Sequence, residues 1–277
     1  MVNTFQLNKK YAEWAERTVY NFFKRKRKKT GMDIFYFGSQ VGTVKRDKSD
    51  APTRPDFILL KNKHVKELER RYHLKFNNVP LRKLMTPFQL SRDDKISLKK
   101  NPEYWLTKIP DKEPLIRDLV KRSCCMLEIK SGFGIFNRDK YEQGRLNIMV
   151  PTDFKRRIRK MQKKFKVRFR TYAAYVMLDC AYIANMADIC KNGSVVTYAH
   201  ERMGTGEVKK DKYYALPFNK AHWFAKIKGV VVRGQKKLTL KAKPFFEINN
   251  GTIRFSLKMK LGKLKQVNKR VLKQLRN

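Results

Sequence analysis

The chain has 277 residues, 42% of them hydrophobic, which is enough to bury the core of one large domain and excludes a disordered composition. Its 66 lysines and arginines against 24 acidic residues give a formal net charge of +42, and such a field requires a polyanionic partner. Nucleic acid is favoured over a membrane surface, because neutralised phosphates release condensed counterions. No apolar run has the length of a membrane span or of a signal peptide, so we expect a cytoplasmic protein.

The four cysteines agree with an intracellular location. Cys124 and Cys125 are adjacent, and Cys180 and Cys190 lack the spacing of a zinc site. We expect all four to be reduced.

The first predicted element is an amphipathic helix over residues 11–24, with Glu13 and Glu16 at the border of its apolar face. A strand over 33–38 follows, and a second strand over 57–60 comes after a polar loop. The segment 64–122 is charged and contains five prolines, which break several short helical patterns such as 65–72. It is interpreted as an insertion.

A third strand is predicted over 124–130, followed by a loop or hairpin over 131–147. A helix then begins with Thr152 or Asp153 as its N-cap and ends near Phe165, and a strand follows over 167–178. Most residues of this helix are basic. Its positive face predicts contacts with nucleic acid through Arg156, Arg157, Lys160 and Lys163, although an ordinary solvated surface explains the pattern equally well.

The last third of the chain alternates apolar and basic residues. Strands are predicted over 224–232, 237–243 and 245–248, and the last of these forms a hairpin with 252–261 across Asn249-Asn250-Gly251. In that final strand Arg254 and Lys258 share the polar face, where they are expected to lie along phosphates. Residues 262–277 form a basic tail, predicted to be helical. The chain therefore divides into a core over 1–200 and a β-rich basic region over 201–277, a candidate for DNA binding or dimerisation.

Two short apolar runs carry the acidic residues of a candidate hydrolytic metal site. Asp56 follows Pro55 at the start of the second strand, and Glu128, Ile129 and Lys130 lie in the third. A divalent cation requires hard oxygen ligands, which the two carboxylates and the Ile129 carbonyl supply, and Lys130 is placed to orient or deprotonate a water.

These residues resemble the PD-(D/E)xK nuclease superfamily, which includes type II restriction endonucleases and Holliday-junction resolvases. The resemblance covers residues 11–178, in the order helix with an acid, strand, Pro-Asp strand, Glu-x-Lys strand, helix, strand. It implies an α/β core with a mixed central sheet flanked by helices. It also implies that Asp56 and Glu128 bind Mg²⁺, which Mn²⁺ can replace, that Lys130 is the catalytic lysine, and that Glu16, with Glu13 as substitute, is the additional acid.

A second Glu-x-Lys triplet, Glu207-Val208-Lys209, lies in a stretch too hydrophilic for a central strand, so Glu128 is kept as the candidate ligand. One departure from the family is that Asp56 and Glu128 are farther apart in sequence than is usual, so the segment 64–122 must loop out and return Cys124 beside Phe57. In the purely structural alternative, Asp56 caps a turn and Glu128 pairs with Lys130 at a sheet edge.

The resemblance implies a Mg²⁺-dependent endonuclease that cleaves double-stranded DNA, and a homodimeric type II restriction endonuclease is the first expectation. A structure-specific nuclease of the junction-resolving or repair type is the second. A non-enzymatic nucleic-acid-binding protein is the alternative from a different class, because the basic surface alone suffices for it.

Overall fold

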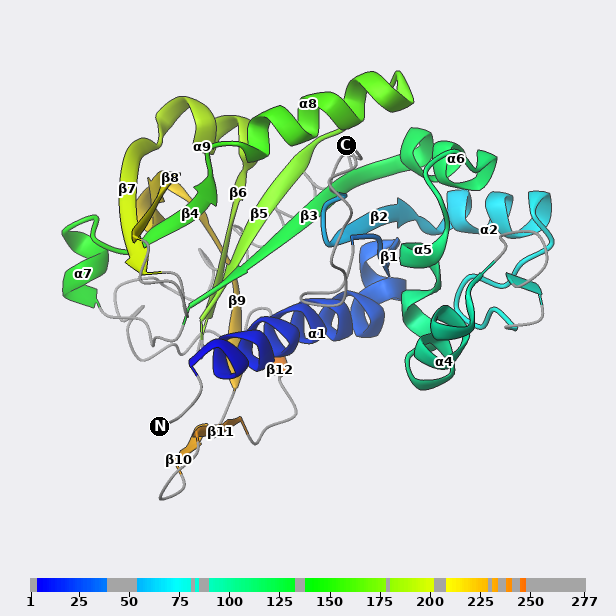
Figure 1. Ribbon diagram of the computed structural model, residues 1–277, viewed down its shortest axis with the longest axis horizontal. Helices are drawn as coiled ribbons and strands as arrows, with labels where there is room; N and C mark the ends of the chain where they lie inside the picture. Colours follow the sequence, from blue (N-terminus) through cyan, green and yellow to red (C-terminus); the bar gives the residue numbers. More distant parts are fainter. Residues whose placement is uncertain are drawn as a thin grey trace.

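The computed structural model describes residues 4–38, 54–80, 83–84, 90–132, 138–177, 180–201, 208–228, 231–233, 238–240 and 245–247. The fold is mixed α/β, with a mixed sheet flanked by helices, as the sequence predicts (Figure 1). The helices are α1 (Thr4–Thr30), α2 (Asn62–Arg71), α4 (Arg92–Lys100), η1 (Pro102–Tyr104), α5 (Trp105–Lys108), α6 (Pro114–Arg122), α7 (Arg138–Glu142), α8 (Phe154–Phe165), α9 (Met186–Asn192) and η2 (Phe218–Lys220). The strands are β1 (Met32–Tyr36), β2 (Phe57–Lys61), β3 (Ser123–Ser131), β4 (Asn147–Pro151), β5 (Thr171–Val176), β6 (Cys180–Asn185), β7 (Ser194–Glu201), β8 (Val208–Pro217), β9 (His222–Lys228), β10 (Val231–Arg233), β11 (Leu238–Leu240) and β12 (Phe245–Glu247).

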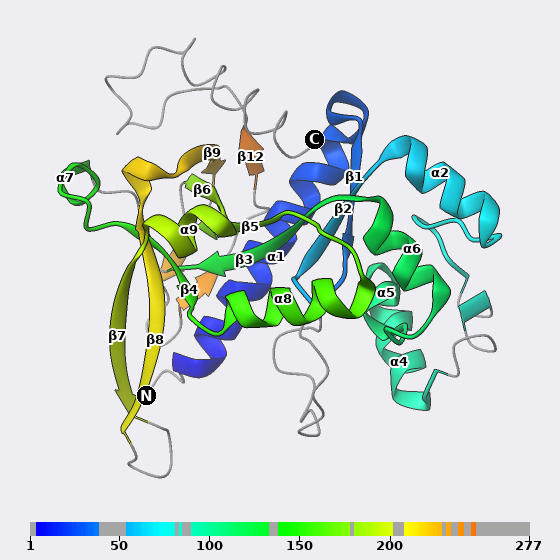
Figure 2. The same ribbon diagram turned by 90° about the horizontal axis from the view of Figure 1, so that it is seen from above.

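In the part of the chain that the structure describes, the main sheet has seven strands in the order β1-β2-β3-β5-β6-β9-β12. Of these described pairs only β3–β5 is parallel, and the others are antiparallel. A parallel pair needs a crossover connection, which α7, β4 and α8 make here. Helix α8 covers one face of the sheet and α1 covers the other (Figure 1, Figure 2).

Helix α1 is longer at both ends than the sequence predicted. Its buried face includes Ala15, Val19, Phe22 and Phe23, at the spacing that indicated the helix. The basic run over 24–29 continues the helix, because lysine and arginine are good helix formers. The helix ends where Gly31, with φ +67°, donates its N–H to the Arg27 carbonyl at 3.0 Å.

The described residues of the predicted insertion contain the short helices α2, α4, η1, α5 and α6, which lie beside the β1–β2 end of the sheet (Figure 1). The expected helix over 65–72 corresponds to α2. One buried side chain ties this segment to the start of β2: Arg54 donates to the carbonyls of Leu106 (3.1 Å) and Ile109 (2.6 Å) and forms an ion pair with Asp111. Lys164 of α8 also pairs with Asp111, at 2.8 Å.

Strands from the predicted core and from the region after residue 200 pair with each other. A second sheet has the order β4-β8-β7, while β9 and β12 extend the main sheet beyond β6. A further pair, β10 and β11, is antiparallel. The expected strand over 252–261, with Arg254 and Lys258, and the tail over 262–277 lie outside the described residues.

One expectation for the region around α8 is confirmed and one is wrong. Asp153, one of the two residues expected at the N-cap, occupies that position; it makes no side-chain capping bond, and its carboxylate pairs with Arg157 one turn later, at 3.3 Å. The strand after α8 begins at Thr171 rather than at residue 167. Lys166 ends the helix in the left-handed conformation, and Val167 bonds back to the Gln162 carbonyl at 3.1 Å, so the chain cannot yet join the sheet.

Cys124, Cys125, Cys180 and Cys190 are all thiols, with no disulfide among them. Among the described residues, no helix has both the length and the apolar character needed to cross a membrane.

Replacing Arg54 with methionine is expected to lower the free energy of unfolding by about 2–3 kcal/mol, because two carbonyls lose their donor and Asp111 loses one of its cations. Urea denaturation followed by circular dichroism measures the change. Arg71→Met is the matched control, since Arg71 is 60% exposed where it pairs with Asp118, and we expect it to cost less than about 1 kcal/mol. Equal losses in the two variants would contradict the role of Arg54.

Candidate active site

The candidate site forms where β2 and β3 run side by side. Phe57 pairs with Leu127, so Asp56, one residue earlier, lies opposite Glu128. The Asp56 Oδ2 atom accepts a hydrogen bond of 2.6 Å from the Ile129 backbone N–H, across a sequence separation of 73 residues. The structure therefore brings together the two acids that the insertion separates in sequence.

Glu128 and Lys130 lie on the same face of β3, because alternate residues of a strand share a face. The Lys130 ammonium donates to Glu128 Oε1 at 2.7 Å. This is the ion pair of the purely structural alternative, but its setting differs from that reading. β3 is an interior strand between β2 and β5, and Asp56 bonds to a neighbouring strand instead of capping a turn.

Helix α1 contributes the third acid. It packs against β3, and Glu16 is 8% exposed whereas Glu13 is on the exposed side of the helix. Glu16 interacts electrostatically with Glu128 and with Asp56. Of the two glutamates that the sequence offered, Glu16 is the one that the fold places at the site.

Burial and mutual repulsion both raise the pKa values of Glu16 and Asp56. Burial, reinforced by the charges of Glu128 and Glu13, raises the pKa of Glu16 to about 7, although Lys130 opposes this. Burial, Glu128 and Glu16 hold the pKa of Asp56 well above its ordinary value, while Lys130 and the Ile129 N–H work against the rise. The site thus concentrates negative charge beyond what one ammonium group compensates.

Lys130 is held in its charged form. Burial by itself would lower the pKa of Lys130, but Glu128 and Asp56 outweigh burial, so that the pKa is raised above its ordinary value. Lys130 is therefore a hydrogen-bond donor and a fixed positive charge in this arrangement. Of the two roles expected for it, orienting a water fits this state, and deprotonating one does not.

The donor set suits a hard divalent cation. As placed, the described residues contain no group of three or more His, Cys, Asp or Glu side chains arranged to hold a metal ion. Asp56 and Glu128 nevertheless offer carboxylate oxygens on neighbouring strands, and repulsion between these acids is the kind of imbalance that Mg²⁺ relieves. The chemistry of these residues fits the ion expected from the sequence, and Asp56 and Glu128 are the side chains that would hold it.

A glycine that the sequence reasoning missed positions Asp56. The N–H groups of Phe37 and Gly38 both donate to the Asp56 carbonyl, at 2.8 and 3.2 Å. A Cβ atom on Gly38 would lie 2.9 Å from the Pro55 carbonyl oxygen and 3.1 Å from the Asp56 Cα, and backbone atoms cannot move away cheaply. Its only signal in the sequence is a glycine directly after the first strand.

The predicted nucleic-acid contacts on α8 lie at different depths. Arg157 is partly buried, and its charge opposes the rise in the pKa of Lys130. It therefore lies near the acidic cluster, by which we mean Asp56, Glu128 and Glu16. Arg156, Lys160 and Lys163 are exposed on the same helix. Arg254 and Lys258 lie outside the described residues.

Comparison with known proteins identifies no relative. No protein-family model, no curated protein and no solved structure matches this chain.

The raised pKa of Glu16 predicts a pH-dependent effect of Glu16→Gln in the presence of EDTA. Between about pH 4.5 and pH 7 the folded chain keeps a proton that the unfolded chain has released, so this group makes the wild type less stable as the pH rises. Glutamine imitates the protonated form at every pH. The variant should therefore be more stable than the wild type by roughly 2 kcal/mol at pH 8, with a much smaller difference at pH 5.

Urea denaturation at the two pH values measures this difference. Asp139→Asn is the control, because Asp139 is exposed on α7 and is not among the groups that shift the pKa of Glu16; its effect on stability should be small at both pH values. A Glu16→Gln variant whose relative stability is the same at both pH values would contradict the buried repulsion.

Proposed function

We propose that the protein is a metal-dependent nuclease that hydrolyses phosphodiester bonds of DNA. The observation that carries the proposal is the convergence of Asp56, Glu128 and Lys130 on adjacent strands of a buried sheet, although 73 residues of sequence separate Asp56 from Ile129. Rigid neighbouring strands hold such groups more precisely than loops do.

The order of elements supports the resemblance to the PD-(D/E)xK superfamily. The elements follow one another in the expected order: α1 with an acid, strand β1, the Pro-Asp strand β2, the Glu-x-Lys strand β3, helix α8 and strand β5. On this basis we propose a restriction-endonuclease-like core. The segment between β2 and β3 is then an insertion that leaves the pairing of these strands intact.

The residues of the site have separable roles in this proposal. Asp56 and Glu128 would hold Mg²⁺, with the Ile129 carbonyl as a further oxygen donor. The bound ion would supply a water of lowered pKa and would stabilise charge that develops on the phosphoryl oxygens. The charged Lys130 would orient the attacking water and stabilise negative charge beside it, while Glu16 adds to the negative field of the site.

Double-stranded DNA is the proposed substrate because the net charge of +42 favours a polyphosphate. Arg157 provides a cation near the acidic cluster, and Arg156, Lys160 and Lys163 continue the positive charge along the exposed side of α8. A type II restriction endonuclease is the first proposal for the subtype. It would act as a homodimer, because two sites related by a twofold axis can cut both strands of a palindrome.

Asp56→Asn and Lys130→Ala are each expected to lower cleavage of plasmid DNA in Mg²⁺ by at least roughly 100-fold, because each removes charge on which the transition state depends. Affinity for the same DNA, measured by fluorescence anisotropy, should change less than about threefold. EDTA should abolish cleavage by the wild type. Asp139→Asn, at an exposed position of α7, is the control and should cleave normally.

The pattern of products decides the subtype. Discrete plasmid fragments support a restriction enzyme, whereas exclusive cutting of four-way or flapped DNA supports a structure-specific nuclease. A wild-type protein that binds DNA tightly but cuts neither substrate with Mg²⁺ or Mn²⁺ would overturn the enzymatic proposal and leave a nucleic-acid-binding protein.

A further inference from the structure

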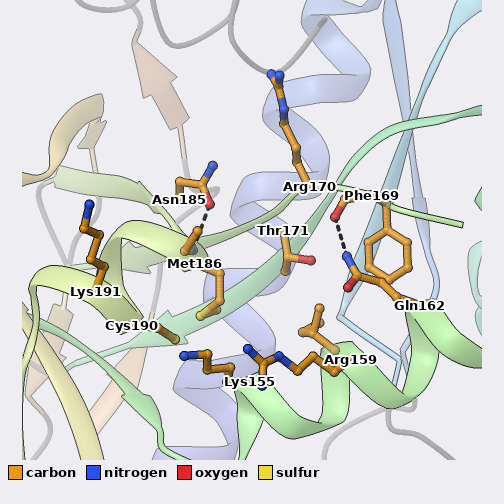
Figure 3. A pocket seen from close by; sticks show the side chains of 12 residues that line it. Lys155, Arg159, Gln162, Phe169, Arg170, Thr171, Asn185, Met186, Cys190 and Lys191 are labelled. Carbon is orange, nitrogen blue, oxygen red and sulfur yellow. Dashed lines mark hydrogen bonds between the residues drawn. The ribbon is translucent and has the colours of Figure 1, made fainter.

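A cavity of about 510 Å³ opens between α8, α9 and the start of β5 (Figure 3). Helix α8, which contributes to its lining, covers one face of the main sheet, whereas α1, the helix that carries Glu16, covers the other (Figure 1). Its lining contains four cationic side chains, Lys155, Arg159, Arg170 and Lys191, and no carboxylate.

Two of the cations turn into the cavity. Lys155 and Arg159 are one turn apart on α8, and both extend toward Cys190 (Figure 3). Burial raises the pKa of the Cys190 thiol, and the charges of Lys155 and Arg159 oppose that rise, as expected for cations close to it. Among the described residues neither cation has a carboxylate partner within ion-pair distance. Arg170 and Lys191 stand at the rim, where their head groups point away from the centre (Figure 3).

The wall also contains polar groups with hydrogen-bonding capacity to spare. Gln162 uses its amide nitrogen to donate to the Phe169 carbonyl at 3.0 Å, so its carbonyl oxygen stays available as an acceptor. Asn185 uses its oxygen to accept from the Ala187 N–H at 2.9 Å, so its NH₂ group stays available as a donor. Thr171 has a buried hydroxyl with no hydrogen-bond partner among the described residues.

The remaining wall is apolar. Ile158, Phe169 and Met186 are almost fully buried and line the cavity beside the cations. Apolar walls with a few convergent polar groups, in a space of roughly 300–1,000 Å³, are typical of small-molecule sites. Cations that only interact with solvent do not require an apolar cavity beside them.

We propose that this cavity binds a nucleotide unit, either as a free nucleotide or as one residue of a polynucleotide. Lys155 and Arg159 hold the phosphate, the apolar wall accepts the base, and Gln162 and Asn185 provide one acceptor and one donor for its edge. The site does not depend on the acidic cluster, so it exists whether or not the chain cleaves DNA.

The test is isothermal titration calorimetry of the full chain at low salt with EDTA, which removes any contribution from a metal at the acidic site. The ligands are inorganic phosphate, a nucleoside 5′-monophosphate, the nucleoside without phosphate, and a trinucleotide. We expect the monophosphate or the trinucleotide to bind at least tenfold more tightly than phosphate or nucleoside alone. Binding of the trinucleotide alone identifies the polynucleotide as the source. Equal affinity for nucleoside and monophosphate would overturn the role of the cations.

Two double variants separate the cavity from general electrostatics. Lys155→Gln with Arg159→Gln removes one lysine and one arginine from the lining of the cavity, and Arg92→Gln with Lys99→Gln removes the same charges from exposed positions on α4. The first pair should weaken nucleotide binding at least tenfold and the second less than about twofold. Equal losses in both pairs would overturn the proposal, because they would indicate only a diffuse positive field.

A third variant fills the cavity without changing its charge. Ala187 is exposed at the start of α9 and lines the hollow, so Ala187→Trp should fold normally and compete with the ligand for space. We expect at least a tenfold loss of nucleotide affinity with an unchanged circular dichroism spectrum. Retention of full affinity in this folded variant would also overturn the proposal. Cleavage assays play no part in these measurements, so failure of this site and failure of the nuclease are distinguishable.

Discussion

The pairing of β2 with β3 is the constraint on which the acidic site depends. Every group of the site is placed relative to that pair: Asp56 at the entry to β2, Glu128 and Lys130 on β3, and Glu16 on the helix that packs against β3. The chain between the two strands must leave the sheet and return in exact register. A slip of one residue would turn Glu128 and Lys130 to the opposite face.

The intervening segment achieves this return through specific anchors. Tyr72, just after α2, donates to Asp118 on α6 at 2.8 Å, which joins the departing and returning helices. Arg54 holds the later part of the segment against the residues that precede β2, and Asp111 links it on to Lys164 of α8. The same contacts that stabilise the insertion therefore also hold Asp56 in place.

The buried acids of the site are unfavourable for folding. Three carboxylates share one ammonium group, and burial together with their mutual repulsion raises the pKa of Glu16 and of Asp56. A protein selected for stability alone would not gather uncompensated acids in its interior. Such groupings are common at functional sites, where a ligand supplies the missing charge. Helix α8 shows the opposite electrostatic character: its apolar stripe of Phe154, Ile158, Met161 and Phe165 packs inward, while cations on its other sides face the cavity and the solvent.

The sequence alone determined the helix around 11–24, the strands at 33–38, 57–60 and 124–130, and the acids within them, because periodicity and turn residues are local signals. The local pattern placed the start of the strand after α8 too early: it begins at Thr171 and not at residue 167, because Lys166 and Val167 still bond to the last turn of the helix. The tertiary structure alone decided that Glu16 faces the site, that Lys130 stays charged, that Gly38 must lack a side chain, and that α8, α9 and β5 enclose a cavity. These outcomes depend on register and burial between segments distant in the chain, which no pattern within one segment encodes.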